Sequence, residues 1–199
     1  MKTLIIILLL TNLAFSSTSI YDIKSDGEEI GTLSVKTKTL SNNQRVYKTH
    51  LKIDIDTFIF SYHLEYKENA LFDNKGLLRF KVEEFEDGQK KRMSAKRKNG
   101  RLIFKNGKKI LLSKIGITPF DMDETSPYAN IDSKSFTLKS FDALTGELFD
   151  NSYKVFESHK QLRLEKRNSR DDEVEVMTIS KEGKLLSIKG VDFEMTLRK

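Results

Sequence analysis

Two histidines and a glutamate are the residues whose types and spacing come nearest to a chemical site. His50 and His63 lie in neighbouring stretches of alternating apolar and polar residues, and Glu65 follows His63 at a spacing of two. If these stretches form a hairpin with its turn near Asp56-Thr57, His50 faces His63 across the pair and Glu65 shares their face. Two imidazoles and a carboxylate on one face could bind a metal ion or transfer a proton.

The same face of this hairpin also carries Lys48, Lys52 and Asp54, which are typical of a solvent-exposed surface. The alternative to a metal site is therefore an outward, hydrated face on which the histidines have no chemical role. We favour this alternative, and we predict that the chain holds neither a metal nor another cofactor.

The densest positive charge lies between Lys90 and Lys98, where six of nine residues are Lys or Arg. Such a run can bind nucleic acid or anionic lipid headgroups. No helix-turn-helix or RNA-binding signature accompanies it, and we expect the chain to be exported, so we predict no nucleic-acid partner. An anionic lipid or lipopolysaccharide site stays open, and we favour an edge hairpin kept soluble by its lysines.

No pattern in the sequence indicates an enzyme. Neighbouring acids occur in predicted turns, but they do not face one cleft at the separation of about 5 to 10 Å that glycoside hydrolysis needs. The sequence has no nucleophile elbow, phosphate loop, dinucleotide fingerprint or zinc-protease motif. It also has no cysteine, which excludes disulfides, thiolate metal sites and cysteine nucleophiles. We therefore predict a protein that is not an enzyme.

The N-terminus has the organisation of a secretory signal peptide. Lys2 precedes an apolar run from Leu4 to Leu10, and Ala14-Phe15-Ser16 provides a cleavage site with small residues. The run is shorter than the roughly 20 apolar residues that span a bilayer. We expect a signal peptide over residues 1–16, a single domain over residues 17–199, no transmembrane anchor in the mature chain, and a periplasmic or secreted bacterial location.

The rest of the chain has an apolar–polar period of two, which is the period of a β-strand. The alternation is clearest from Val46 to Thr57, from Phe58 to Tyr66 and from Val191 to Leu197. Successive side chains of a strand point to opposite faces, so each stretch has one apolar face and one hydrated face. This is typical of an antiparallel sheet with one covered face.

Further strand candidates are separated by turns that contain Gly or Asn where a hairpin needs a positive φ. They cover residues 29–35, 77–85, 91–98, 101–104, 110–113, 135–140, 153–156, 161–166, 173–180 and 184–189. We predict a mainly β fold, a single antiparallel meander curled into an open or closed β-barrel. Thr118-Pro119 begins one short helix, which Pro127 ends, in a helix or loop insertion near residues 118–133.

Several segments of the sequence together resemble those of a known family. They are Tyr21-Asp22-Ile23 leading into Gly27 to Gly31, the long hairpin from Val46 to Tyr66, the stretch Asp142 to Leu148, and Glu182 to Leu186. This layout resembles bacterial periplasmic proteins classed as a domain of unknown function and, more distantly, the open β-barrels of periplasmic lipoprotein carriers. The resemblance implies an export signal and a curved sheet with an apolar inside, and it transfers no catalytic or ligand-binding residue. The aromatic-rich segment between the two halves of such proteins is reduced here to Phe120 and Tyr128.

An apolar and aromatic stripe is the remaining candidate for a functional feature. The residues that could line a cavity are Leu51, Ile53, Phe58, Phe60, Tyr62, Tyr66, Phe80, Phe193 and Met195. A filled barrel core needs the same residues, so the pattern leaves a ligand cavity and a filled core equally open. Our leading hypothesis is an exported envelope protein that binds an apolar or amphipathic, lipid-like ligand inside a curved β-sheet.

Two other classes of function stay open. One is a periplasmic protein-interaction or structural module with a filled core and no ligand, which meets another envelope protein through its charged exterior or a sheet edge. The other is an enzyme built from scattered residues such as His63 and Glu65.

Overall fold

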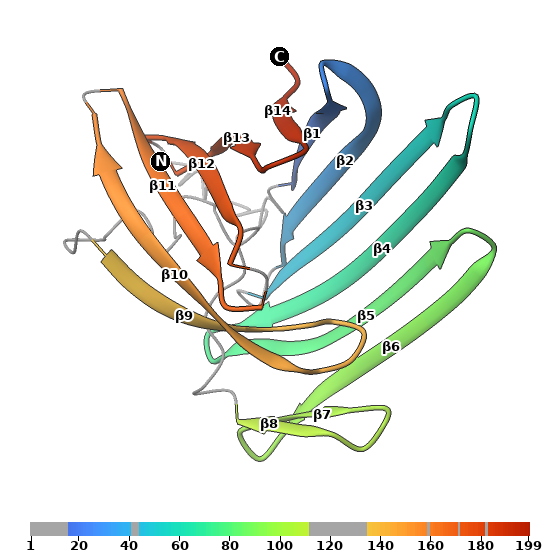
Figure 1. Cartoon of the computed structure of the whole chain (residues 1–199). Coiled ribbons are helices and arrows are strands. Elements are labelled where there is room, and N and C mark those ends of the chain that lie inside the picture. The colour runs from blue at the N-terminus through green and yellow to red at the C-terminus, as the bar shows by residue number, and fades with distance from the viewer. Residues whose placement is uncertain (1–15, 41–43, 112–134, 159, 171, 182) are drawn as a thin grey trace, which may run out of the picture.

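The computed structural model describes residues 16–199 except 41–43, 112–134, 159, 171 and 182, and strands are the only regular elements among them (Figure 1). The strands are β1 Ser16–Ser25, β2 Glu28–Thr39, β3 Arg45–Asp56, β4 Ser61–Asp73, β5 Gly76–Glu86, β6 Gln89–Lys98, β7 Arg101–Phe104, β8 Lys109–Leu111, β9 Ser135–Phe141, β10 Leu148–Glu157, β11 Gln161–Asn168, β12 Val174–Ser180, β13 Leu185–Lys189 and β14 Glu194–Leu197. The mainly β prediction is confirmed. The predicted short helix near residues 118–133 and nearly all of the predicted signal peptide fall outside the described residues.

The strands form one antiparallel sheet, in which strands that are consecutive in the chain pair with each other except at one place. The first and last strands also pair, with Tyr21 opposite Leu197 and Lys24 opposite Glu194. The N-terminal and C-terminal strands of the chain therefore lie side by side within the sheet, and the two edges of the sheet are β8 and β9. In the described part of the chain no ladder of hydrogen bonds links β8 to β9, so the barrel is open there, and we call this opening the seam.

Tight turns make the meander possible. Asn99 and Gly100 have φ of 52° and 70°, which is the left-handed geometry that a two-residue hairpin between β6 and β7 requires. Asp87 and Gly88 adopt the same geometry between β5 and β6, with φ of 43° and 83°. The other turns predicted from glycine, at residues 73–76, 106–107 and 181–183, also lie between strands, so the predicted turn positions are confirmed.

Two parts of the predicted strand pattern are wrong or incomplete. β1 was not among the predicted strands. The hairpin between β3 and β4 turns at residues 57–60, so β4 begins at Ser61 rather than at Phe58. The reason is local hydrogen bonding: the backbone N–H of Thr57 donates to the Phe60 carbonyl at 2.9 Å, and Thr57 Oγ1 accepts from the Phe60 N–H at 3.1 Å. These bonds favour a closed turn over two more residues of strand.

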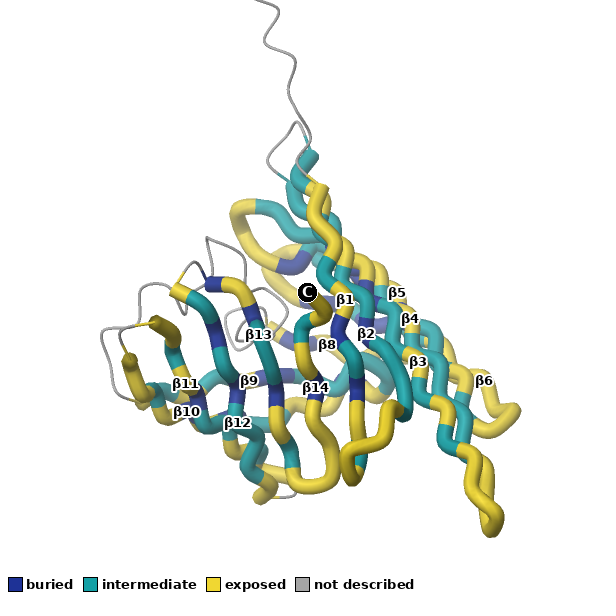
Figure 2. The backbone as a smooth tube through the Cα atoms, turned by 90° about the horizontal axis from the view of Figure 1, so that it is seen from above, coloured by how far each residue is buried: buried dark blue, intermediate teal, exposed yellow. Residues whose placement is uncertain are grey.

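The buried side chains form two clusters on the inner face of the sheet. The first joins β1, β2 and β10–β14, and its most buried members are Leu164, Met177 and Ile179, all 0% exposed. The second joins β3–β8 and includes Val82 and Leu102, also 0% exposed. Figure 2 shows the buried segments toward the middle of the strands, while the hairpin turns are exposed. The core is therefore divided between the two halves of the curved sheet.

Three phenylalanine rings join the two sides of the seam. Phe104 of β7 lies with its ring centroid 5.6 Å from Phe80 of β5 and 5.6 Å from Phe141 of β9. Phe80 and Phe141 are 5.4 Å apart. Ring pairs at these separations are favourable beyond their buried area. Side-chain packing thus links β5 and β7, near one edge of the sheet, to β9 at the other edge, although no backbone ladder connects the two edges in the described residues.

Candidate ligand-binding surfaces

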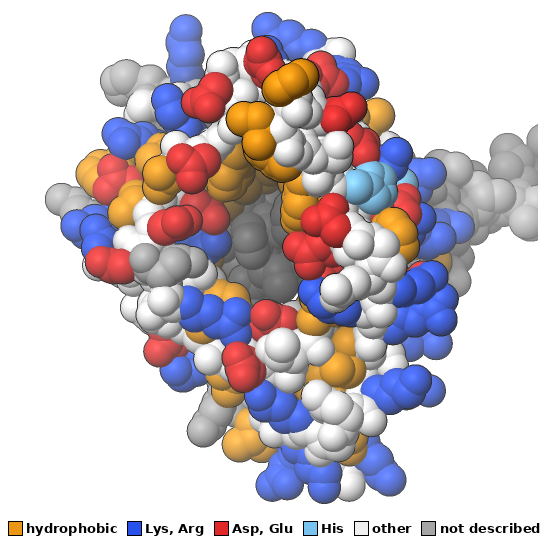
Figure 3. All heavy atoms as spheres, turned by 45° about the vertical axis from the view of Figure 1, so that its right-hand side comes forward, with side chains coloured by type: hydrophobic (Ala, Val, Ile, Leu, Met, Phe, Trp, Pro, Cys, Tyr) orange, Lys and Arg blue, Asp and Glu red, His pale blue; other side chains and the backbone are white. Residues whose placement is uncertain are grey.

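Part of the predicted cavity lining lies on the inner face of the β3–β4 hairpin and forms a wall that is only partly buried. Its members are Leu51, Ile53, Tyr62 and Tyr66. Leu51 is directly opposite Tyr66, and burial along the inner face decreases from Tyr47 toward the hairpin turn. Figure 3 shows a face of the molecule that is hollowed, with hydrophobic and charged side chains around the hollow. We call Leu51, Ile53, Tyr62 and Tyr66 the inner wall.

The other predicted lining residues are placed differently. Phe80 and Met195 are 3% and 5% exposed and belong to the two core clusters. Phe58 and Phe60 lie in the β3–β4 turn and are 105% and 56% exposed, and Phe193 lies beside the β13–β14 turn and is 37% exposed. Strand alternation does not direct side chains within a turn, so these three do not join the inner wall.

The inner wall also carries a carboxyl group. Glu68 follows Tyr66 at the strand period, so both side chains face inside, and Tyr66 Oη donates a hydrogen bond of 3.0 Å to Glu68 Oε2. Burial raises the pKa of Glu68, although the bond from Tyr66 favours the ionised form. Burial first, and then the charge of Glu68, raise the pKa of Tyr66. The inside of the hairpin is therefore amphipathic.

Replacing Glu68 by glutamine is expected to stabilise the protein at pH 7. Because the folded-state pKa of Glu68 is raised above the ordinary 4.5, ionisation costs stability once the pH exceeds the unfolded pKa, and below it the cost disappears. Glutamine keeps an acceptor for Tyr66 and has no charge to bury. We expect Tm at pH 7 to rise by about 2–4 °C, the shift that roughly 1 kcal/mol produces in a domain of this size.

Thermal unfolding followed by circular dichroism at pH 7 and pH 4 measures this effect. At pH 4 the gain should largely vanish, and Glu28→Gln, at an exposed position of β2, should change Tm little at either pH. A gain from Glu68→Gln that is the same at both pH values would contradict the assigned burial of the charge.

The two histidines do not face each other, so the hypothesised cluster of two histidines and Glu65 is not formed. Because the turn lies later than predicted, His63 is opposite Asp54 and bonds to it, whereas His50 Nε2 lies 2.8 Å from Glu65 Oε1. Lys67 first, and then His50, lower the pKa of Glu65 to about 2. Among the described residues no group of three His, Cys, Asp or Glu could hold a metal ion.

The basic run forms β6, and carboxylates of β5 neutralise its first half. Lys91 Nζ lies 3.0 Å from both Glu84 Oε1 and Glu86 Oε2, and Arg92 Nε lies 3.2 Å from Glu83 Oε1. β7 pairs only with residues 95–98 of β6, so within the described chain the first half of β6 is a sheet edge. The first half of the basic run is therefore largely neutralised by the neighbouring carboxylates of β5.

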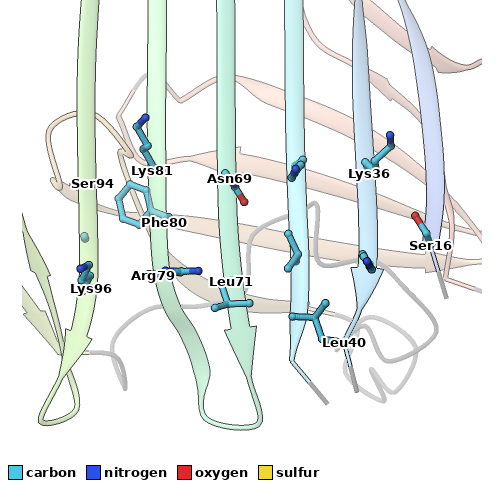
Figure 4. A pocket seen from close by; sticks show the side chains of 14 residues that line it. Ser16, Lys36, Leu40, Asn69, Leu71, Arg79, Phe80, Lys81, Ser94 and Lys96 are labelled. Atoms are coloured by element: carbon cyan, nitrogen blue, oxygen red, sulfur yellow. The ribbon is translucent and has the colours of Figure 1, made fainter. Parts of the chain in front are cut away.

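A groove lies on the opposite face of the sheet from the core, across β1–β6 (Figure 4). Its volume is about 680 Å³, within the range of small-molecule sites. Its cationic side chains are Lys36, Lys38, Lys48, Arg79, Lys81 and Lys96, and its aliphatic side chains are Leu40, Val46 and Leu71. We call it the outer groove.

The strand register explains how these cations meet. Lys36 is directly opposite Lys48, which in turn is opposite Asn69, and Asn69 is opposite Lys81. A second row runs through Lys38, Val46, Leu71, Arg79 and Lys96. Of the six cations only Lys81 has an ion pair within the described residues, with its Nζ 3.0 Å from Glu83 Oε1.

The outer groove was missed in the sequence because its cations come from four different strands, and only Lys96 belongs to the basic run from Lys90 to Lys98. The available signal is weaker. Lys36 with Lys38, and Arg79 with Lys81, are spaced by two, which places both members of a pair on one face of a strand. Only the register shows that the pairs lie side by side.

Residues 21–152 match the model of a protein family described as a domain of unknown function (DUF6134). This match covers more than half of the chain. The chain belongs to the DUF6134 family. The resemblance inferred from the sequence, to a family of unknown function with an open barrel, is therefore confirmed. No curated protein matches this DUF6134 chain.

Two solved structures are similar to the DUF6134 chain in fold. One is the beta-barrel-like protein of domain of unknown function DUF1849 from Brucella abortus, with a TM-score of 0.68 and 15% identity over 92% of this chain and 95% of that chain. The other is a DUF1089 family protein from Pseudomonas aeruginosa, with a TM-score of 0.50 and 13% identity over 80% of this chain and 89% of that chain. At these identities the likeness shows the fold alone, a β-barrel-like sheet. Within the described residues no helix is long and apolar enough to cross a membrane.

Proposed function

We propose that this DUF6134 protein is an exported envelope protein that binds an apolar or amphipathic, lipid-like ligand inside its open barrel. The observation that carries the proposal is the inner wall, where apolar side chains such as Leu51 and Ile53 face inside yet stay only partly buried. Covering such a wall with hydrocarbon contributes roughly 25 cal/mol per Å² of apolar surface removed from water. The signal peptide predicted over residues 1–16 supports the periplasmic or secreted location.

Polar atoms on the inside support an amphipathic ligand rather than a purely apolar one. Glu68 and Tyr66 present a carboxyl and a hydroxyl on β4. On the other side of the barrel Asn151, 2% exposed, donates from Nδ2 to Ser140 Oγ at 2.8 Å, while its Oδ1 has no hydrogen-bond partner among the described residues. A ligand with one polar end and a hydrocarbon chain matches this mixture, because buried polar groups need hydrogen-bonding partners.

Native mass spectrometry of the full chain purified from its own host tests the proposal. The expected result is an added mass of one lipid-sized molecule, together with saturable uptake of a fluorescent fatty acid. Leu51→Ala removes part of the inner wall and should weaken uptake on the order of tenfold. Leu148→Ala removes the same side chain at a position that is 40% exposed, and it should leave uptake unchanged.

A mass equal to the bare chain, with no fatty-acid uptake, would contradict the proposal. The second candidate function, an interaction module that binds an envelope protein, would then be favoured. It rests on the tip of the β3–β4 hairpin, where Phe58, Ile59 and Phe60 are 105%, 91% and 56% exposed. Exposed apolar clusters of this kind often mark contact sites.

A further inference from the structure

The cations of the outer groove are arranged in a way that folding alone does not favour. Lys36 and Lys48 are directly opposite each other on β2 and β3, and like charges at such positions repel. Elsewhere on the same sheet opposite charges are neighbours, as Lys91 is for Glu84 and Lys166 is for Glu175. The outer groove therefore concentrates positive charge that the described part of the chain leaves largely uncompensated.

Concentrated positive charge in a concave surface attracts anions, because the field there is stronger than over a flat surface. Neighbouring strands lie about 4.8 Å apart, so the rows from β2 to β6 present cations over roughly 20 Å. One phosphate cannot contact cations over that distance. The dimensions match several anionic groups held side by side.

We propose that the outer groove binds the phosphate headgroups of anionic phospholipids at a bilayer surface. This proposal concerns the face opposite the inner wall and does not depend on a ligand inside the barrel. The cations contact the phosphates. Leu40, Val46 and Leu71, which lie among the cations and are partly buried, contact the glycerol and upper acyl region, as apolar side chains do at a membrane interface.

The aliphatic character of the groove favours lipid over nucleic acid. Proteins that bind single-stranded nucleic acid stack bases on aromatic rings. Among the described residues, Phe80 is the only aromatic residue that borders the outer groove. Its ring is packed against Phe104 and Phe141 in the core, and 3% of the residue is exposed. No aromatic ring of the described residues is therefore available in the groove for stacking.

Vesicle flotation of the full chain tests the proposal. The probes are vesicles of phosphatidylglycerol mixed with phosphatidylcholine and vesicles of phosphatidylcholine alone. The chain should bind the first kind at low salt and lose that binding as the salt concentration rises. A triple variant, Lys36→Gln, Lys48→Gln and Lys96→Gln, should bind on the order of 100-fold more weakly, given about 1 kcal/mol per basic residue near an anionic membrane.

The matched control is Lys154→Gln, Lys184→Gln and Lys189→Gln, which removes the same charge from exposed positions in the other half of the sheet. It should bind within about threefold of the unaltered chain, since it lies outside the groove. The groove variant should keep or raise Tm, because it removes the repulsion between Lys36 and Lys48, and this separates lost binding from lost folding.

Four results would overturn the proposal. Equal losses in both variants would mean that net charge alone drives binding. Equal binding to phosphatidylcholine vesicles would mean that the headgroup charge is not recognised. Complete displacement by millimolar inorganic phosphate would indicate a site for a free anion, and tighter binding of a single-stranded oligonucleotide than of the anionic vesicles would indicate nucleic acid.

Discussion

Replacing Phe104 by alanine is expected to lower the free energy of unfolding by about 3–5 kcal/mol, the usual cost of deleting a fully buried ring. Phe104 is 2% exposed and contacts Phe80 and Phe141. Because Phe141 belongs to β9 and Phe104 to β7, the substitution removes packing that links the two sides of the seam. Denaturant unfolding followed by circular dichroism measures the loss.

The control for this experiment is Phe60→Ala, at a ring that is 56% exposed in a hairpin turn, which should cost less than about 1 kcal/mol. A double-mutant cycle with Phe141→Ala should give a coupling energy of about 0.5–1.5 kcal/mol between Phe104 and Phe141. A coupling energy near zero would show that the rings do not hold the seam together.

Replacing Gly31 by alanine is expected to cost about 3 kcal/mol, because the added methyl group has no space. Gly31 of β2 is opposite Ile53 of β3, and a Cβ atom there would lie 2.0 Å from the carbonyl oxygen of Lys52. The obstacle is backbone, so a side-chain rotation cannot relieve it. β2 has a bulge beside this position, where Ile23 and Lys24 of β1 pair with Gly31 and Glu29 and leave Ile30 without a partner in the register; close approach of strands is a common reason for glycine in a strand.

Gly27→Ala is the matched control, in the turn between β1 and β2. Its Cβ would meet nothing within 4 Å, but its φ is +86°, so the expected cost is only about 1 kcal/mol. Chemical unfolding of the two variants compares the effects of a steric obstacle and of a strained backbone angle. A Gly31→Ala variant no less stable than Gly27→Ala would contradict the close approach of β2 and β3.

Local features of this protein were predictable because they depend on neighbours in the chain. Leu51, Ile53 and Ile55 alternate with charged residues and do face inside. Asn99-Gly100 predicted a turn, since only a few residue types adopt its backbone angles at low cost. The error at Phe58 and Phe60 also has a local cause, the hydrogen bonds of Thr57, which compete with continuation of the strand.

The candidate sites were predictable only in part. The inner face of the hairpin was correctly assigned for Leu51 and Tyr66, because alternation alone decides which face a strand residue occupies. The histidine pairing was wrong because a shift of the turn changes every cross-strand partner. Of the outer groove the sequence indicated only Lys96, as part of the basic run, since Lys36, Lys48 and Lys81 meet only through pairings among four strands.

The sequence by itself determined that this chain forms strands, which residues of the predicted strands face the core, and where most turns lie. The physical reason is that strand period and turn angles are properties of a few adjacent residues. The tertiary structure alone decided that β1 pairs with β14, that the barrel opens between β8 and β9, and that three rings link that opening. It also decided which lysines lie side by side, because the pairing and register of strands that are distant in the chain depend on packing of the whole sheet.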